Sequence, residues 1–222
     1  MIQVAEGAWQ IPVLPRQSLN CYLLGDVLVD AGLRSSGSKL LRALRGKAVA
    51  AHALTHAHAD HQGASAEVCK ALNLPLWCHA IEKEAVESGN VTGSFADPAS
   101  PMVRFQQRFL AGAGHPVART LAEGDIVGGF EVIETPGHTR GHISFWRSAD
   151  GVLIAGDALV GMNLFTTKPK LGLPVRMASW DMGVVRTSLR KLAALDPKRV
   201  AFGHGPAASG DAFAQFVDTL VG

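Results

Sequence analysis

Four side chains that can bind a metal ion lie within six consecutive positions of the sequence. They occur in the stretch T-H-A-H-A-D-H-Q-G and are His56, His58, Asp60 and His61. Imidazole nitrogens and carboxylate oxygens are ligands that Zn²⁺ and similar metals prefer, and no cysteine lies nearby to suggest a closed structural zinc site. Ala57 and Ala59 between them leave room for a metal and its water. We therefore interpret this stretch as a metal site.

A solvated loop, or histidines hydrogen-bonded within the core, is the alternative interpretation of these residues. The flanking residues are apolar, and each polar group buried beside them without a partner would cost roughly 1–3 kcal/mol. If residues 48–54 form a buried strand, the alternation of side chains places His56, His58 and the following Asp on one side. A turn at Asp60 would bring His61 beside them. The metal interpretation therefore gives all four groups a partner.

Three further ligand-type side chains lie in glycine-rich turns, each directly after a predicted buried strand. They are His138 in T-P-G-H-T-R-G-H, Asp157 in I-A-G-D-A and His204 in F-G-H-G-P. Glycine lets the backbone approach a ligand closely, so a rigid sheet can present side chains to a site from such turns. His142 could bind in place of His138. Asp30, at the end of an early strand, is predicted to support neighbouring groups rather than to catalyse.

Strands and helices must alternate along the chain to position these residues. Hydrophobic alternation and turn signals predict strands at residues 4–11, 19–24, 27–29, 49–54, 74–78, 125–127, 130–135, 142–147, 152–155 and 200–202. Helical spacing predicts helices at residues 38–45, 62–72, 81–87, 102–110, 180–195 and 211–221, with Ser179 as the cap of the fifth. The alternation of these elements predicts an α/β protein. The length suits a single domain over residues 1–222.

The segment 88–116 differs from the rest of the chain. Glycines, prolines and small residues surround one amphipathic piece at residues 102–110. We expect a loop and helix that could cover a site as a lid, although its aromatic side chains could equally pack on the core. The apolar character of this segment also makes a homodimer an expectation.

Composition excludes several classes of partner. Hydrophobic residues make up 47% of the chain and charged residues 18%, as in ordinary globular proteins. The net charge of +2, with dispersed Lys and Arg, predicts no nucleic-acid partner. We find no secretion signal and no membrane-spanning run, which predicts a cytoplasmic protein without a membrane partner. The three scattered cysteines, Cys21, Cys69 and Cys78, are interpreted as small buried hydrophobes.

The ordered set of ligand-type residues resembles the metallo-β-lactamase superfamily. The match consists of H-x-H-x-D-H at 56–61 followed by His138, Asp157 and His204, and it spreads over almost the whole chain. The resemblance implies a four-layer αββα sandwich with a site for two metal ions at one edge. It implies that His56, His58 and His138 hold the first metal, that Asp60, His61 and His204 hold the second, and that Asp157 bridges them. Asp30 and His142 would support the ligands from behind.

Such a ligand set is suited to hydrolysis. Three protein ligands around one metal leave positions open for water and substrate, which is typical of a catalytic site. Two metals can share a hydroxide that is nucleophilic at neutral pH while one of them polarises the attacked carbonyl. Asp60 is the candidate for carrying a proton to the leaving group. We therefore predict a hydrolase of small thioesters, esters or lactones that uses two divalent ions, zinc first, with iron or manganese as alternatives.

The branch within the superfamily is less sharply defined. Asp157 points to the glyoxalase II and lactonase branches, because the β-lactamases proper usually have Cys or Ser there. Only about 18 residues follow His204, whereas glyoxalase II binds glutathione partly through a carboxyl-terminal helical extension. Lactonases of the quorum-quenching type place a Tyr soon after the bridging Asp, but the only tyrosine here is Tyr22.

Two other activities of this scaffold are alternatives. A persulfide dioxygenase-like oxidoreductase would use one iron held by His56, His138 and Asp157. A phosphodiesterase or nuclease is disfavoured by the weak net charge and by the lack of a basic insertion.

Overall fold

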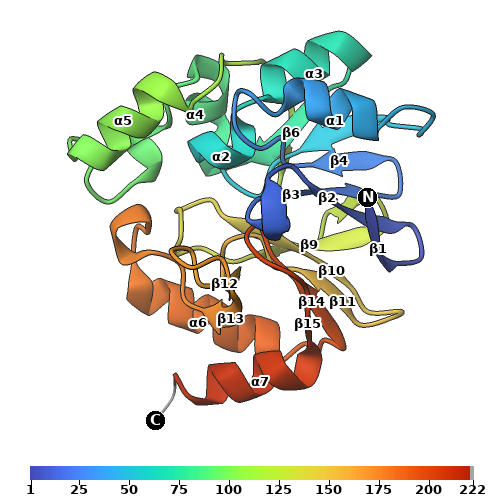
Figure 1. Cartoon of the computed structure of the whole chain (residues 1–222), viewed down its shortest axis with the longest axis vertical. Coiled ribbons are helices and arrows are strands. Elements are labelled where there is room, and N and C mark those ends of the chain that lie inside the picture. The colour runs from blue at the N-terminus through green and yellow to red at the C-terminus, as the bar shows by residue number, and fades with distance from the viewer. Residues whose placement is uncertain (221–222) are drawn as a thin grey trace.

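Residues 1–220 are described by the computed structural model, and they form two stacked sheets covered by helices on both outer faces (Figure 1). The first sheet has seven strands in the order β1-β2-β3-β4-β5-β6-β7. Their bounds are β1 Ile2–Ala5, β2 Ala8–Pro12, β3 Asn20–Leu24, β4 Val27–Val29, β5 Ala51–Ala53, β6 Leu76–His79 and β7 Val117–Leu121. The first four strands pair antiparallel, and β4 to β7 pair in parallel.

The second sheet has six strands in the order β15-β14-β11-β10-β9-β8. Their bounds are β8 Ile126–Val127, β9 Phe130–Glu134, β10 Ile143–Arg147, β11 Val152–Ile154, β14 Arg199–Ala201 and β15 Ala208–Ser209. All neighbours are antiparallel except β11 and β14. The remaining pair, β12 Val160–Met162 and β13 Pro169–Gly172, forms a separate hairpin.

Three layers of buried hydrophobic side chains hold the sandwich together. One lies between the first sheet and the helices α1 (Gly37–Ala43) and α3 (Ser65–Leu72), one between the two sheets, and one between the second sheet and the helices α6 (Met182–Ala193) and α7 (Gly210–Asp218). Representative members are Leu28, Leu40 and Val68 in the first layer, Tyr22, Phe130 and Phe145 in the second, and Leu153, Leu189 and Phe213 in the third. The predicted αββα order is confirmed by this layering.

Several predicted elements have different limits in the structure. The single strand expected at residues 4–11 is a hairpin of β1 and β2, because Gly7 takes a left-handed conformation (φ +65°) between them. The helix expected at 62–72 is split into α2 (Ala59–Gln62) and α3, with Ala64 outside helical geometry. The helix expected from residue 180 begins at Met182, where Asp181 caps it by accepting bonds from Gly183 N and Val184 N.

Two excursions from the sandwich lie beside its open edge. The segment 88–116 contains η3 (Val91–Ser94) and α5 (Pro101–Phe109), which confirms the amphipathic helix expected there. After it comes β7, which sequence patterning missed because three of its five side chains are exposed. The second excursion is the β12–β13 hairpin with η4 (Arg176–Ala178), which was also not predicted.

Short helices η1 (Pro15–Gln17), η2 (Ala80–Glu82) and α4 (Lys83–Ser88) complete the fold. All three cysteines are buried and unpaired, as their interpretation as small hydrophobes requires. Within residues 1–220, no helix combines the length and the hydropathy needed to cross a bilayer.

Candidate metal centre

The candidate ligands lie at one edge of the sandwich, directly beyond the carboxyl ends of strands from both sheets. In chain order, Asp30 follows β4, the 56–61 stretch follows β5, His138 follows β9, Asp157 follows β11 and His204 follows β14. The sheet alternation does not continue through the stretch as expected. β5 ends at Ala53, and His58 caps α2 in extended geometry, so Asp60 and His61 reach the site from the first turn of a helix.

Seven ligand-type side chains converge at this edge. They form three overlapping groups in which the candidate ligand atoms all lie within 4.8 Å of one another. The groups are His56, His58 and His138; His56, His61 and Asp157; and Asp60, His61 and His204. The first and third groups coincide with the two ligand sets expected from the sequence.

The carboxylate of Asp157 is the centre of the cluster. Its Oδ2 lies 3.2 Å from His204 Nε2, 3.4 Å from His61 Nε2 and 3.6 Å from His138 Nε2. It therefore contacts members of both expected ligand sets. His204 Nε2 also lies 3.3 Å from Asp60 Oδ2.

Several polar atoms in the cluster are buried without a hydrogen-bond partner. They are Nε2 of His56, His58, His61 and His138, together with Oδ1 of Asp157. Leaving so many polar atoms unpaired in one place would be costly, because each carries a desolvation penalty. All five are atoms of the kind that coordinate divalent metals. The residues present therefore fit a metal centre.

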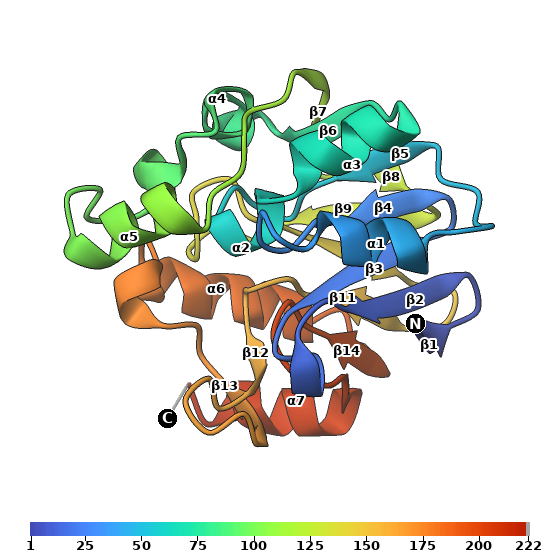
Figure 2. The same cartoon turned by 45° about the horizontal axis from the view of Figure 1, so that its top comes forward.

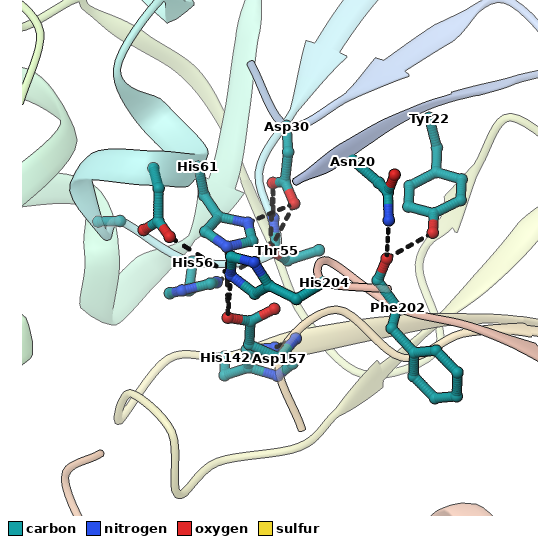
Figure 3. Close-up of polar contacts among 12 residues, drawn as sticks. Asn20, Tyr22, Asp30, Thr55, His56, His61, His142, Asp157, Phe202 and His204 are labelled. Carbon is teal, nitrogen blue, oxygen red and sulfur yellow. Dashed lines mark hydrogen bonds and ion pairs between the residues drawn. The ribbon is translucent and has the colours of Figure 1, made fainter. Parts of the chain in front are cut away.

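Asp30 holds the rear of the cluster through Thr55 and His61 (Figure 3). Its carboxylate accepts bonds from Thr55 N at 2.8 Å, from Thr55 Oγ1 at 2.8 Å and from His61 Nδ1 at 2.8 Å. Thr55 Oγ1 also lies 3.0 Å from His56 Nδ1. Because Nδ1 of His61 is occupied, its Nε2 is the nitrogen turned to the site. Asp30 thus has the supporting geometry expected from the sequence.

His138 and His142 have different surroundings. Nδ1 of His138 lies 3.1 Å from Ser179 Oγ, which leaves Nε2 facing the cluster. Both nitrogens of His142 are engaged: Nδ1 lies 2.8 Å from Thr135 Oγ1, and Nε2 accepts a bond from Asp157 N at 3.0 Å. The geometry therefore favours His138 as the ligand and makes His142 a support for the backbone of Asp157. Ser179, expected to cap a helix, instead orients His138.

The turn that carries His204 is fixed by polar residues of the first sheet that sequence analysis did not single out as site residues. Nδ1 of His204 donates to Ser18 O at 2.6 Å. Asn20 Nδ2 and Tyr22 OH donate to Phe202 O at 3.1 and 2.6 Å (Figure 3). The sequence signal is weak, since it amounts to a buried Asn and Tyr within an apolar strand.

Glu82 is a second residue that sequence analysis missed. It is 2% exposed and accepts bonds from Ala57 N at 3.2 Å, from Gly141 N at 2.9 Å and from Ser94 Oγ at 3.3 Å. Its carboxylate therefore ties the backbone between His56 and His58 to the loop that carries His138 and to η3. Nothing in the spacing around residue 82 indicates this role.

Burial and neighbouring charges lower the pKa values of some histidines of the cluster and raise that of His204. Burial lowers the pKa of His58 to about 4 and holds the pKa values of His56 and His138 well below the ordinary histidine value, with neighbouring histidines adding to the effect for these two. These imidazoles are neutral at pH 7, as metal ligands must be. Burial acts in the same direction on His204, but Asp157 and Asp60 outweigh it and raise the pKa of His204 to about 10.

The two carboxylates of the cluster are ionised at neutral pH. Burial would raise the pKa of Asp157, but His204 and His61 outweigh it and hold that pKa well below the usual value. His204 and His61 likewise lower the pKa of Asp60 against the effect of burial. Burial would lower the pKa of His61, but Asp157 and Asp30 outweigh it and raise that pKa. A divalent cation bound by these ligands would take the place of the protons.

The cluster forms the floor of a cavity of about 200 Å³. Apart from the candidate ligands, its lining is apolar except for Gln106, and it consists of Met102, Gln106, Val160, Leu164, Pro174, Val175 and Ala178. Phe95 stacks on His58 with ring centroids 4.0 Å apart. The walls therefore come from α5, from the β12–β13 hairpin and from η4, which lie on the same side of the molecule in Figure 2.

Comparison with known proteins agrees with this architecture. Residues 15–204 match the model of a family described as the metallo-beta-lactamase superfamily. The probable metallo-hydrolase YflN of Bacillus subtilis is 30% identical over 84% of this chain and 78% of its own length. The chain therefore belongs to the metallo-β-lactamase superfamily and is a metal-dependent hydrolase. The resemblance inferred from the ligand spacing is thus confirmed.

Two further similarities bear on substrate and metal. A hydroxyacylglutathione hydrolase of Cereibacter sphaeroides is 33% identical over 72% of this chain, although the match spans only 50% of that enzyme. The crystal structure of TTHA1623 in a di-iron-bound form has a TM-score of 0.73 and 27% identity, and it covers 93% of this chain and 97% of its own.

Proposed function

We propose that this protein is a dinuclear metal hydrolase that cleaves small thioesters, esters or lactones. The observation that carries the proposal is the convergence of five buried, unpartnered ligand atoms at one edge of the sandwich. His56, His58 and His138 would hold the first metal and Asp60, His61 and His204 the second, with Asp157 close enough to serve both sets. Two divalent ions held in this way would supply a water activated at neutral pH and a polarised substrate carbonyl.

The remaining steps belong to the protein's own residues. Asp30 and Ser179 fix the tautomers of His61 and His138, so that the correct nitrogen faces the site. Asp60 lines the cavity and lies 3.3 Å from His204 Nε2. It is the group that we assign to carry the proton to the leaving group. The apolar walls exclude bulk water, which strengthens the electrostatic interactions in the cavity.

We further propose a single domain over residues 1–222 in which the segment 88–116 covers the site. Met102 and Gln106 of α5 line the cavity, and Phe95 stacks on His58. A small-molecule substrate, rather than a nucleic acid or a membrane, suits a cavity of about 200 Å³. The homodimer and the cytoplasmic location expected from the sequence stay predictions.

The ester and thioester chemistry is supported by the partial similarity to the hydroxyacylglutathione hydrolase. Glutathione itself is not assumed, because the match spans 50% of that enzyme. Iron is a second candidate metal, since the solved neighbour TTHA1623 was crystallised in a di-iron-bound form. A single iron at His56, His138 and Asp157 would instead indicate the dioxygenase-like alternative.

The test is hydrolysis by protein reconstituted with zinc, manganese or iron(II) after chelation. The panel consists of p-nitrophenyl acetate, S-lactoylglutathione, an acyl thioester of N-acetylcysteamine and an N-acyl homoserine lactone. We expect metal-dependent turnover of at least one member and none by the chelated protein. Fully metal-loaded protein that cleaves no member of the panel would contradict the proposal. Oxygen uptake in the presence of a persulfide would then support the dioxygenase-like alternative.

A further inference from the structure

Two more cavities adjoin the metal-centre pocket, and each shares a different set of lining residues with it. The first has a volume of about 360 Å³ and shares Asp60, Gln106 and His204 with the pocket. Apart from these shared residues and Ser18, its walls are apolar, and they include Leu14, Leu33 and Phe105. Within residues 1–220, no charged side chain other than Asp60 and His204 lines this cavity. We refer to it as the apolar cavity.

The second adjoining cavity lies under the β12–β13 hairpin and has a volume of about 230 Å³. It shares Val160, Leu164 and Val175 with the metal-centre pocket. Lys170 is the one charged side chain among the described residues that line it. We refer to it as the hairpin cavity.

Positive charge gathers around the hairpin cavity. The segment 158–180 contains Lys168, Lys170 and Arg176 but no Asp or Glu, in a chain whose net charge is only +2. All three are exposed. Arg16 also reaches this hairpin and donates to Thr167 Oγ1 at 2.9 Å. Within residues 1–220, none of these four cations forms an ion pair with an acidic side chain. The hairpin therefore offers uncompensated positive charge to an anion.

The two sides of the metal centre thus differ in a way that matches the two arms of an ester. A scissile carbonyl must lie over the metals, so its acyl chain and its leaving group extend in different directions. An apolar arm gains about 0.8 kcal/mol for each methylene buried, which corresponds to roughly fourfold in affinity, and the apolar cavity buries it away from Lys170. An anionic arm is attracted to the hairpin.

Resting on the proposed hydrolase function, we propose that the substrate is a thioester or ester that joins an apolar acyl chain to a phosphate-bearing carrier. The acyl chain occupies the apolar cavity, and the carrier extends through the pocket to Lys170. In the reaction, water supplies the OH group that forms the new C–O bond of the acid. The C–S or C–O bond to the carrier breaks, and the second proton of water goes to the carrier's thiol or hydroxyl.

The carrier arm is tested by comparing two thioesters that differ in their phosphates. These are octanoyl-coenzyme A and octanoyl-N-acetylcysteamine, which share the acyl chain and the thiol end. We expect kcat/KM to favour the phosphate-bearing thioester by more than tenfold at low salt and the preference to shrink as ionic strength rises. In the Lys168→Gln/Lys170→Gln variant the preference should fall to within about threefold. Lys70→Gln, an exposed lysine on α3, is the control and should leave it unchanged.

A third substrate distinguishes a phospholipid carrier from a soluble phosphorylated thiol. Vesicles of dioleoylphosphatidylglycerol present apolar acyl chains as oxygen esters on a phosphate-bearing headgroup. Faster fatty-acid release from vesicles than from octanoyl-coenzyme A would support the proposal with a phospholipid carrier, and the reverse would support it with a soluble phosphorylated thiol. Equal turnover of thioesters with and without phosphates, unaffected by Lys168→Gln/Lys170→Gln, would overturn it.

The acyl arm is tested at Leu14, which lines the apolar cavity and is 36% exposed. Leu14→Trp should fill the cavity without disturbing the core. We expect it to lower kcat/KM for octanoyl-coenzyme A by about tenfold or more and to change that for acetyl-coenzyme A less than twofold. Leu72→Trp, at a position 39% exposed on α3, is the matched control. Equal effects on the two chain lengths would contradict this assignment of the acyl arm.

These experiments distinguish an error in the proposed function from an error in the proposed substrate class. If no ester or thioester is hydrolysed by fully metal-loaded protein, the proposed function is wrong. If hydrolysis occurs but neither chain length nor phosphate changes kcat/KM, the function stands and the substrate class is wrong.

Discussion

The floor of the metal-centre pocket and its walls are constructed in different ways. On the floor, five of the seven candidate ligands are buried, and hydrogen bonds with Asp30, Thr55, Ser179 and the His142 ring hold them in place. The walls come from α5, the β12–β13 hairpin and η4, where large apolar side chains such as Phe165 are exposed. The floor is suited to one fixed chemistry, whereas the walls are suited to selecting a substrate.

The largest effect on the floor of the pocket is expected from removing Asp30. Asp30→Ala removes the carboxylate that accepts bonds from His61 Nδ1 and Thr55 N. All three residues are buried. Removing one partner of a buried charged pair costs about 3–5 kcal/mol, and losing such a support typically lowers metal affinity about 10–100-fold. Denaturant unfolding and competitive chelation measure the two effects. Wild-type stability and metal affinity in the variant would show that the floor does not depend on this support.

A smaller loss is expected at Glu82, which joins the floor to one wall. Glu82→Gln keeps the size of the side chain but replaces one of the two oxygens that accept from Ala57 N and Gly141 N with an NH2 group, which cannot accept. We expect kcat to fall about tenfold, because hydrogen bonds to charged groups contribute about 1.5–3 kcal/mol. Glu84→Gln, at an exposed position two residues along the chain, is the control and should leave kcat unchanged. Equal kcat values for the two variants would rule out a role of Glu82 in positioning.

A buried histidine of β5, His52, makes the stability of the protein depend on pH. Burial lowers the pKa of His52 from the ordinary 6.5 to about 4. The unfolded chain therefore binds a proton at His52 that the folded protein does not, so stability is present above pH 6.5 and is lost as the pH falls toward about 4. We expect His52→Gln to flatten the fall in unfolding free energy over this window. An unchanged slope would mean that His52 is not the titrating group.

The smallest effect on stability is expected on the walls. Phe165 at the hairpin is 93% exposed, so Phe165→Ser should change the unfolding free energy by less than about 0.5 kcal/mol. Phe95 is 3% exposed and stacks on His58, so Phe95→Ala should cost about 3–5 kcal/mol. Thermal unfolding of both variants makes the comparison. Similar losses would show that the hairpin is part of the folded core after all.

The convergence of the candidate ligands was predictable because their residue types are rare and their spacing is tight. Residues 56–61 and the glycine-rich turns at His138, Asp157 and His204 indicate the candidate site without a structure. Hydrophobic periodicity predicted the alternation of strands and helices, and the αββα order was implied by the family resemblance. The local error at Asp60 arose because strand alternation was continued past Ala53, whereas β5 ends there and α2 begins at Ala59.

The walls and supports could not be predicted in the same way. Glu82 accepts bonds from the distant backbone groups Ala57 N and Gly141 N, and the backbone oxygen of Ser18 accepts from the distant His204 ring, so no local pattern marks either residue. The strands β7, β12 and β13 escaped detection because β7 and β13 are largely exposed and β12 is only three residues long, which leaves no clear hydrophobic alternation. The adjoining cavities depend on three excursions meeting in space, which only tertiary structure shows.

The most direct test of the account is the metal content per chain of protein purified without added metal, measured by elemental analysis for the wild type and for Asp157→Ala. The account predicts about two divalent ions in the wild type and about one or fewer in the variant, because Asp157 lies between the two ligand sets. A single ion in the wild type, or a content that Asp157→Ala leaves unchanged, would contradict the bridged centre.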